Sequence, residues 1–212
     1  KYKLLPFITK VVDKECSDIQ SIADIFAGTG AVSSAFTDKI IITNDLMYSN
    51  YICNYAWFGS ETYNQQTIID YVVHYNSLLK LKDNYMTDNF ANTYFSRDDC
   101  AKIGYIREDI EKNYKKKNIN DRERAILITS LLYAMDKIAK TCGHYDAYRK
   151  GAEFDKPLEL LVPLAERHNN PNNRCYNEDA NDLIGSINAD LVYIDPPYNS
   201  RQYCGSRNKG KI

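Results

Sequence analysis

Two short stretches of this 212-residue chain combine residue types that could act on a ligand. One of them, Asp195-Pro196-Pro197-Tyr198, directly follows the apolar run 189–194. Two prolines hold the backbone rigid and supply no amide donors, so the carbonyl groups beside them stay free to accept hydrogen bonds. The Asp195 carboxylate and the Pro196 carbonyl could both accept from one –NH2 group, while Tyr198 offers a flat face to a planar base.

This pattern indicates group transfer to an aromatic amine. Hydrogen bonds to the amine draw the nitrogen lone pair out of ring conjugation and direct it toward an electrophile. Positioning and charge complementarity then carry the step, and no strong general base is needed at its outset. A Pro-Pro turn with a capping Asp195 is the alternative interpretation.

The second stretch lies near the N-terminus and contains two closely spaced glycines, in the order Asp24-Ile25-Phe26-Ala27-Gly28-Thr29-Gly30. Glycines after a strand permit a tight turn and let the backbone approach a ligand. Asp45, at the end of the next apolar run, could accept hydrogen bonds from two ribose hydroxyls. These features suit a nucleoside-containing cofactor, and an ordinary turn followed by a helix-capping Asp45 is an equal alternative. The third glycine of a dinucleotide site and the lysine of an ATP-binding loop are both absent, which counts against NAD and ATP.

The apolar pattern predicts an α/β fold whose parallel sheet positions both stretches. Runs over 22–26, 40–43 and 189–194 are short and apolar or β-branched, as in buried strands, and a helix-like stretch covers 31–36. The order strand, glycine turn, helix, strand opens a parallel βαβ unit. Because open α/β sheets bind ligands at the carboxyl ends of their strands, both stretches lie where a site is expected.

Helical spacing dominates the middle of the chain. The expected helices are 47–58, 62–82, 98–117 and one that begins after a cap at Asn120 or Asp121 and runs to Thr141, with Gly143 as its C-cap. Residues 1–60 and 171–212 are therefore predicted to form a discontinuous catalytic core, and residues 61–170 a helical insert that supplies specificity.

The sequences FAGTG and DPPY, in this order and separated by a long insertion, resemble the α-class, Dam-type DNA adenine N6-methyltransferases. Residues 1–8 resemble that family's N-terminal motif, and 119–133 and 141–145 resemble the region before its specificity segment. The resemblance implies a class I, Rossmann-like methyltransferase sheet with a mainly helical inserted target-recognition domain. It also implies methyl transfer from S-adenosyl-L-methionine, with S-adenosyl-L-homocysteine as product, to a flipped adenine in double-stranded DNA.

The resemblance also assigns roles to residues. Asp195, Pro196, Pro197 and Tyr198 would hold the target adenine. Asp45 would bind the ribose of the methyl donor and Asp179 its adenine, although a helix N-cap is the alternative for Asp179. The whole set implied to bind the donor is Lys3, Asp24, Phe26, Ala27, Gly28, Thr29, Gly30, Asp45 and Asp179.

Basic residues in the insert are predicted to contact DNA phosphates without reading sequence. Residues 97–150 hold 13 Lys+Arg against 9 Asp+Glu, whereas the whole chain carries a net charge of −1. A solvated helix face is the alternative for such a charge run. The predicted contacts are Lys115, Lys116, Lys117, Arg122, Arg124, Tyr145, Arg149 and Lys150.

Composition bears on the compartment and the partners. The near-zero net charge argues against a uniformly basic nucleic-acid coat. Six scattered cysteines lack disulfide or zinc-ligand spacing and indicate free thiols in a reducing, bacterial cytoplasm, with no bound metal. The sequence has no apolar stretch long enough to predict a signal peptide or a membrane span. The resemblance adds a restriction–modification system, and with it a cognate restriction endonuclease as an expected partner.

Two departures from the family pattern keep other functions open. The family usually has a Gly/Ser/Lys stretch between the positions of Tyr2 and Lys3, and it continues past DPPY through further strands. Three explanations fit these departures: internal segments are missing from the sequence, the chain is a fragment, or it is one part of a split enzyme completed by a complementary polypeptide. The abrupt Tyr2-Lys3 junction favours missing internal segments. The alternative functions are an RNA adenine methyltransferase and a non-catalytic DNA-binding subunit. Related enzymes that act on RNA more often have Asn at the position of Asp195, so the aspartate favours DNA as the substrate.

Overall fold

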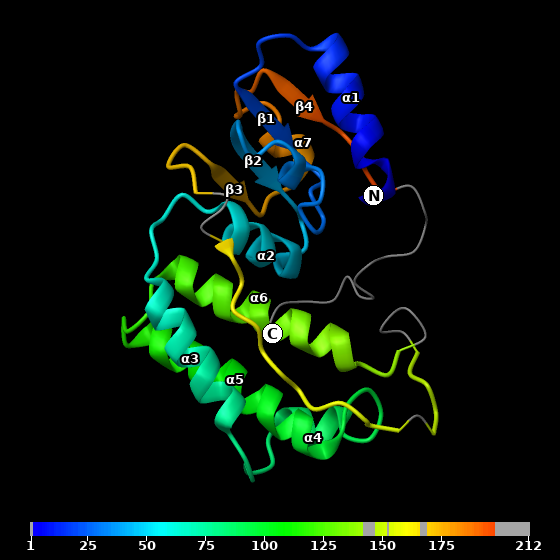
Figure 1. The fold of residues 1–212 in the computed structure, drawn as a ribbon, viewed down its shortest axis with the longest axis vertical. Coiled ribbons are helices and arrows are strands. Elements are labelled where there is room, and N and C mark those ends of the chain that lie inside the picture. Colours follow the sequence, from blue (N-terminus) through cyan, green and yellow to red (C-terminus); the bar gives the residue numbers. More distant parts are fainter. Residues whose placement is uncertain (1, 142–146, 152, 166–168, 198–212) are drawn as a thin grey trace. The chain divides into compact units, whose positions relative to one another are not determined.

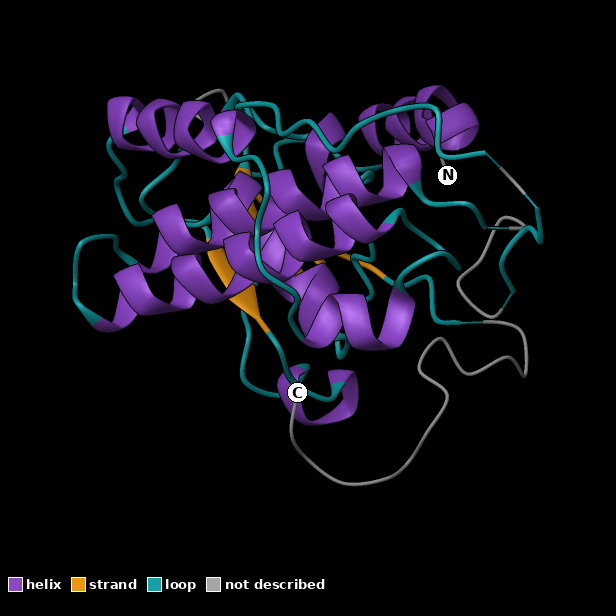
Figure 2. Ribbon diagram, turned by 90° about the horizontal axis from the view of Figure 1, so that it is seen from below, coloured by secondary structure: helices purple, strands orange, loops and turns teal. Residues whose placement is uncertain are grey.

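The computed structural model describes residues 2–141, 147–151, 153–165 and 169–197. Two compact units divide the chain, the first comprising Lys1–Ser60 and His168–Ile212 and the second Glu61–Arg167. Figure 2 shows that helices make up most of the regular structure and that the strands are short.

The first unit contains a sheet whose strands are all parallel (Figure 1). The strands are β1 (Ser21–Asp24), β2 (Ile40–Asn44), β3 (Arg174–Tyr176) and β4 (Leu191–Tyr193), in the spatial order β3-β2-β1-β4. The prediction of a mixed α/β fold with a central parallel sheet is confirmed. The helix-like stretch 31–36 contains only a short 3-10 turn, Ser33–Ala35.

Both faces of this sheet carry apolar side chains, as parallel sheets require. On one face, Ile22 and Ile41 pack with Val12 of α1 (Leu5–Glu15) and Phe58 of α2 (Tyr48–Phe58). The other face presents a cluster of Ala23, Ile25 and Ile42, against which Ala180 of the short helix α7 (Ala180–Leu183) packs. The alternation of neighbouring residues between the two clusters follows from the two-residue period of a strand.

The prediction that 189–194 is a buried strand needs correction. The strand is confined to Leu191–Tyr193, its residues are half-buried, and Ile194 is 61% exposed. The physical reason is that β4 is an edge strand of the described sheet, because it pairs with β1 alone. At its start, the Asp190 carboxylate accepts hydrogen bonds from the Gln20 amide and from Ser21, which lower the pKa of Asp190 and join β4 to β1.

The second unit consists of helices α3 (Gln65–Ser77), α4 (Tyr85–Phe90), α5 (Arg97–Lys115) and α6 (Asp121–Ile138). The predicted helices are confirmed with shorter bounds, and Asn120 is the N-cap of α6, in a capping box with Glu123. The expected cap at Gly143 lies outside the described residues. An extended segment packs on these helices through buried Leu158 and Leu160; Asn76 of α3 forms two hydrogen bonds of 2.9 Å with the Leu160 backbone.

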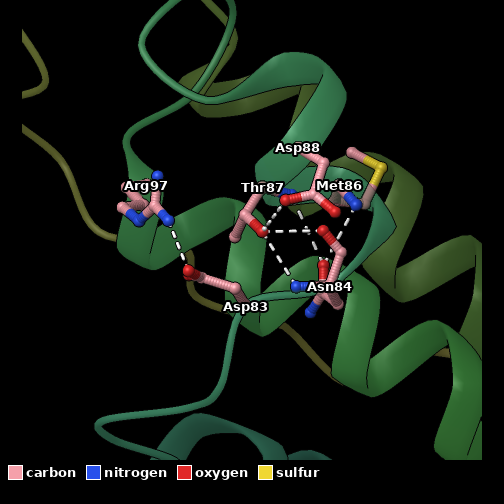
Figure 3. Close-up of polar contacts among 6 residues, drawn as sticks. All are labelled: Asp83, Asn84, Met86, Thr87, Asp88 and Arg97. Carbon is pink, nitrogen blue, oxygen red and sulfur yellow. Dashed lines mark hydrogen bonds and ion pairs between the residues drawn. The ribbon is translucent and has the colours of Figure 1, made fainter.

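Helix α4 has only six residues and is held in place through its N-terminus (Figure 3). The Asn84 side-chain oxygen accepts from the backbone amides of Met86 and Thr87, while the Thr87 hydroxyl accepts from the backbone amide of Asn84 at 2.8 Å. The side-chain Nδ2 of Asn84 also donates to the Ala101 carbonyl of α5 at 2.8 Å. Asp83, directly before this N-cap, forms an ion pair with Arg97, the first residue of α5.

Gly104 of α5 provides the space for this contact. A Cβ at Gly104 would lie 2.3 Å from the Asn84 side-chain oxygen. Gly→Ala inside a helix usually stabilises by about 1 kcal/mol, but we expect Gly104→Ala to destabilise by about 1–2 kcal/mol because it displaces the cap. Urea unfolding measures this. In an Asn84→Ala background the same substitution should become neutral or stabilising, and a stabilising Gly104→Ala in the otherwise unchanged protein would contradict the prediction.

Candidate functional site

The carboxyl ends of the four strands define one edge of the sheet in the first unit. Because all strands run parallel, the segments that follow them emerge at this same edge. These segments are 25–30 after β1, 45–47 after β2, 177–179 after β3 and 194–197 after β4. The strand order reverses between β1 and β4, which is the position where open α/β sheets form a ligand crevice.

The two glycines after β1 serve different purposes. Both have left-handed backbone angles, with φ of +57° at Gly28 and +74° at Gly30. A Cβ at Gly30 would lie 2.5 Å from the Asn54 side-chain oxygen and 2.9 Å from Phe58, so this glycine lets the turn pack on α2. A Cβ at Gly28 would meet no atom within 4 Å. Open space therefore lies over the backbone at Gly28, where a ligand could approach.

Asp45 links the glycine turn to α2. Its Oδ2 accepts from the Gly28 amide and its Oδ1 from the Met47 amide, both at 2.8 Å. The N-cap of α2 is Met47, so Asp45, two residues earlier, closes a turn before the helix and is not its cap, contrary to the helix-capping alternative. A carboxylate has about four acceptor positions, so two remain for the two hydroxyls of a ribose. Holding the glycine turn and binding a ribose are therefore compatible in Asp45.

Other residues expected to bind the donor have different environments. Asp24 is 1% exposed and accepts from the Ser33 hydroxyl at 3.2 Å, which makes it a support beneath the turn and argues against direct ligand contact. Asp179 is exposed and is the N-cap of α7, where its Oδ1 accepts from the Asn181 amide at 2.9 Å. Phe26 is half-buried, while Thr29 is exposed; Ala27 is buried and Lys3 is exposed.

The segment after β4 begins beside the glycine turn. Tyr193 is in register with Asp24, and its carbonyl accepts from the Ile25 amide at 3.4 Å. Asp195 therefore follows β4 by two residues, next to the strand that leads into the turn, and is half-buried. Pro196 and Pro197 are exposed, and Tyr198 lies outside the described residues.

Two of the predicted DNA contacts are at odds with the structure. Arg122 is 1% exposed; it donates to the Glu61 carbonyl at 2.8 Å, and its guanidinium lies 5.1 Å from the centre of the Tyr63 ring. The Arg124 side chain is 13% exposed and is ion-paired with Glu111 at 2.8 Å. A phosphate cannot reach a guanidinium enclosed in this way, so both arginines are reassigned to the packing of the helical unit.

The remaining basic residues are exposed. Lys115 and Lys117 line a cavity of about 610 Å³, but Glu61, Asp121 and Glu123 line it too, so the charge there is mixed. Lys116 is exposed beside them.

Arg149 and Lys150 are exposed at the other end of the helical unit, and neither is ion-paired with a described residue. They follow Tyr148, whose ring contacts that of Tyr94 at 5.7 Å; Tyr145 lies outside the described residues.

Sequence reasoning missed two buried asparagines at the sheet edge, Asn44 and Asn54. Asn54 of α2 is 1% exposed and donates to the Gly28 carbonyl at 3.0 Å, which fixes the turn. Asn44 ends β2 and is 2% exposed. The only signal for Asn44 in the sequence is an amide side chain directly before Asp45 at the end of an apolar run.

Two kinds of feature are absent from the part of the chain that the structure describes. No group of three or more His, Cys, Asp or Glu side chains converges there as metal ligands. Within the same residues, no helix combines the length and apolar character that crossing a bilayer requires.

Comparisons with known proteins identify the family of the chain. The family model described as D12 class N6 adenine-specific DNA methyltransferase matches residues 1–208. The Type II methyltransferase M.NlaIII of Neisseria lactamica is 32% identical over 208 residues, which cover 92% of this chain and 60% of that protein. Modification methylase LlaI of Lactococcus lactis subsp. lactis is 30% identical over 229 residues, covering 97% and 36%. Modification methylase StsI of Streptococcus sanguinis is 32% identical over 222 residues, covering 97% and 34%. The chain thus spans about a third of the length of LlaI and StsI.

Proposed function

Because the chain belongs to the D12 class of N6 adenine-specific DNA methyltransferases, we propose that it transfers a methyl group from S-adenosylmethionine to the exocyclic amine of an adenine flipped out of double-stranded DNA. The names of its relatives, modification methylase and Type II methyltransferase, support a protective role beside a cognate restriction endonuclease.

One observation carries this proposal: the glycine turn and the Asp195 segment follow adjacent parallel strands and emerge at the switch point of the sheet. A methyl donor bound at the turn and an amine held at Asp195 would then be neighbours. Bringing two reactants together in a fixed orientation accounts for much of the acceleration in such a transfer.

The residues at the edge suit S-adenosylmethionine. Open space over Gly28 leaves room for the donor, and the acceptor positions left on Asp45 suit its ribose. Asp179 uses its Oδ1 in capping α7, and its carboxylate is exposed, which suits contact with the donor's adenine. Lys3 is assigned to the methionine end on the resemblance alone.

The bound donor supplies a methyl group on a positively charged sulfur. The Asp195 carboxylate and the Pro196 carbonyl accept the two N–H groups of the target amine, and Pro197 keeps this segment rigid. As the N–C bond forms and the S–C bond breaks, the amine nitrogen gains positive charge, which the Asp195 carboxylate stabilises. One amine proton then passes to water. Tyr198, which lies outside the described residues, is assigned to stacking on the adenine.

Residues 61–170 are proposed to form the target-recognition domain. The compact unit Glu61–Arg167 is large enough to be such a module, and it carries the exposed basic residues Arg149 and Lys150. Lys115, Lys116 and Lys117 are weaker candidates for phosphate contact because carboxylates line the same cavity.

The direct test is incubation of the purified chain with tritiated S-adenosylmethionine and, in parallel, unmethylated bacterial DNA and total RNA. Nucleosides from each digest are then identified by mass spectrometry. N6-methyldeoxyadenosine in the DNA arm is the expected product. Label in RNA alone would favour the RNA enzyme, and DNA retention without any transfer would favour a binding subunit; either result would overturn the proposal.

Removing the charge at Arg149 and Lys150 should weaken DNA binding to all sequences alike. The slope of log K against log salt should become shallower by about 1 for each phosphate that is no longer bound. The affinity of the double variant Arg149→Ala/Lys150→Ala for labelled duplexes is measured by fluorescence anisotropy at several salt concentrations. Arg107→Ala is the matched control, because Arg107 is exposed but ion-paired with Glu111. Equal slopes for the two variants would show that Arg149 and Lys150 do not contact DNA phosphates.

A further inference from the structure

Asn44 makes hydrogen bonds to the segments that follow both neighbouring strands. It is the last residue of β2, which lies between β1 and β3. Its Nδ2 donates to the Ile25 carbonyl at 3.2 Å, after β1, and to the Glu178 carbonyl at 3.1 Å, after β3. Its Oδ1 accepts from the Glu178 amide at 3.0 Å. A single buried side chain thus holds two loops at one edge of the sheet.

These two loops carry separate parts of the proposed donor site. Ile25 directly precedes the glycine turn, and Glu178 directly precedes Asp179. The Asn44 carbonyl also accepts from the Ala27 amide at 2.9 Å, inside the turn. The contacts of Asn44 therefore help to set the separation between the glycine turn and Asp179, and among the described contacts Asn44 is the side chain that bonds to both loops directly.

We propose that Asn44 is a positioning residue for donor binding. It holds the glycine turn and the Asp179 segment at the separation that the adenosine half of S-adenosylmethionine requires, without itself contacting the donor. A ligand that touches two walls binds tightly only when both walls are already in place, because otherwise it must order them on binding. The inference rests on the proposed function, since it needs a nucleoside between these loops.

The chemistry of an amide explains why Asn suits this position. A neutral amide both donates and accepts, so it satisfies the Ile25 and Glu178 carbonyls and the Glu178 amide at once. In Asn44→Ala those three backbone groups lose their partner, and in Asn44→Asp a carboxylate of the same shape faces two carbonyl oxygens. Both substitutions should separate the loops.

Asn173 is a matched control. It is 1% exposed, and its Oδ1 accepts from the Ile41 amide at 2.8 Å, near the opposite end of β2. Asn173→Ala therefore removes a buried hydrogen bond from the same strand without touching the carboxyl edge. Both alanine variants should lower the melting temperature, and only the Asn44 variant should affect the donor site specifically.

The measurement is calorimetric titration of each variant with S-adenosylhomocysteine, well below its melting temperature. We expect Asn44→Ala to raise the Kd by about tenfold, equivalent to about 1.4 kcal/mol, and Asn173→Ala to change it by less than about twofold. At saturating donor and DNA, Asn44→Ala should keep kcat within about threefold of the unchanged enzyme while its KM for the donor rises. If Asn44→Ala does not fold, Asn44→Asp is titrated in its place.

Each possible outcome decides the inference. Equal weakening in the Asn44 and Asn173 variants would mean a general loss of stability, and an unchanged Kd in the Asn44 variant would mean no positioning role. Either result would overturn the inference while leaving the proposed function intact, provided that the unchanged chain binds S-adenosylhomocysteine. If the unchanged chain does not bind it, the donor assignment itself fails and the inference fails with it.

Discussion

Asp195→Ala is expected to lower the rate of methyl transfer into DNA by about 10²–10³-fold, with little change in donor binding. The substitution removes the carboxylate that orients the amine and stabilises the charge developing on its nitrogen, and loss of such a group costs about 10²–10³ in rate even when binding persists. Apart from Lys3, the proposed donor contacts lie on the loops after β1, β2 and β3, and none lies on the segment after β4, so the Kd for S-adenosylhomocysteine should stay within about threefold. Single-turnover transfer of tritiated methyl groups and calorimetric titration measure the two quantities.

A carboxylate at the opposite edge of the sheet provides the control. Asp38 is exposed in the turn before β2 and is ion-paired with Lys39 at 3.1 Å. Asp38→Ala should leave both the transfer rate and the Kd unchanged. If Asp195→Ala retained more than about a tenth of the activity, the assigned role of Asp195 would be wrong.

Gly30→Ala is expected to have the largest effect on stability, about 2–5 kcal/mol. Alanine at φ +74° costs about 1–2 kcal/mol, and its Cβ would overlap the Asn54 oxygen at 2.5 Å and Phe58 at 2.9 Å, which adds about 1–3 kcal/mol. Relaxation of Asn54 would loosen its hydrogen bond to the Gly28 carbonyl, so donor binding should weaken as well. Thermal and urea unfolding give the change in free energy.

Gly28→Ala separates backbone strain from overlap. It imposes a similar left-handed φ, +57°, but its Cβ would meet no atom within 4 Å. We expect a loss of only about 1–2 kcal/mol together with weaker donor binding, because the added methyl occupies the open space over the turn. A Gly28→Ala variant that is as unstable as Gly30→Ala would show that packing against α2 is not what distinguishes the two glycines.

The strands that can be predicted from the sequence are those whose own residues show a strand pattern, without reference to their partners. Ile40, Ile41 and Ile42 are β-branched and apolar, and β1 precedes a recognisable glycine turn. Strand β3 has only Arg174, Cys175 and Tyr176, which show no apolar alternation, and it is a strand because it pairs with β2. Helix α4 escapes prediction for a related reason, since its six residues are stabilised by contacts between Asn84 and α5.

The acidic residues of the candidate site can be found from the sequence, but the residues that hold them cannot. Asp195 directly follows an apolar run, and Asp45 stands one residue beyond another, which is a local pattern. The role of Asn44 depends on Glu178, 134 positions away along the chain. Arg122 illustrates the opposite error: a basic residue in a charged helix start is expected at the surface, whereas contacts with Glu61 and Tyr63 enclose it.

The pairing of β3 with β2 has a consequence for the order in which the chain acquires its structure. During synthesis, β1 and β2 leave the ribosome long before β3 and β4, because the whole helical unit is translated in between. Closing a connection of this length costs little extra free energy, about 0.6 kcal/mol per doubling, but contacts so distant in sequence slow folding. We therefore expect α5 and α6 to assemble co-translationally while one face of β1 and β2, formed by Ala23, Ile25 and Ile42, stays uncovered until α7 and β4 are made. That interval is when a nascent chain is most prone to aggregate and most in need of a chaperone.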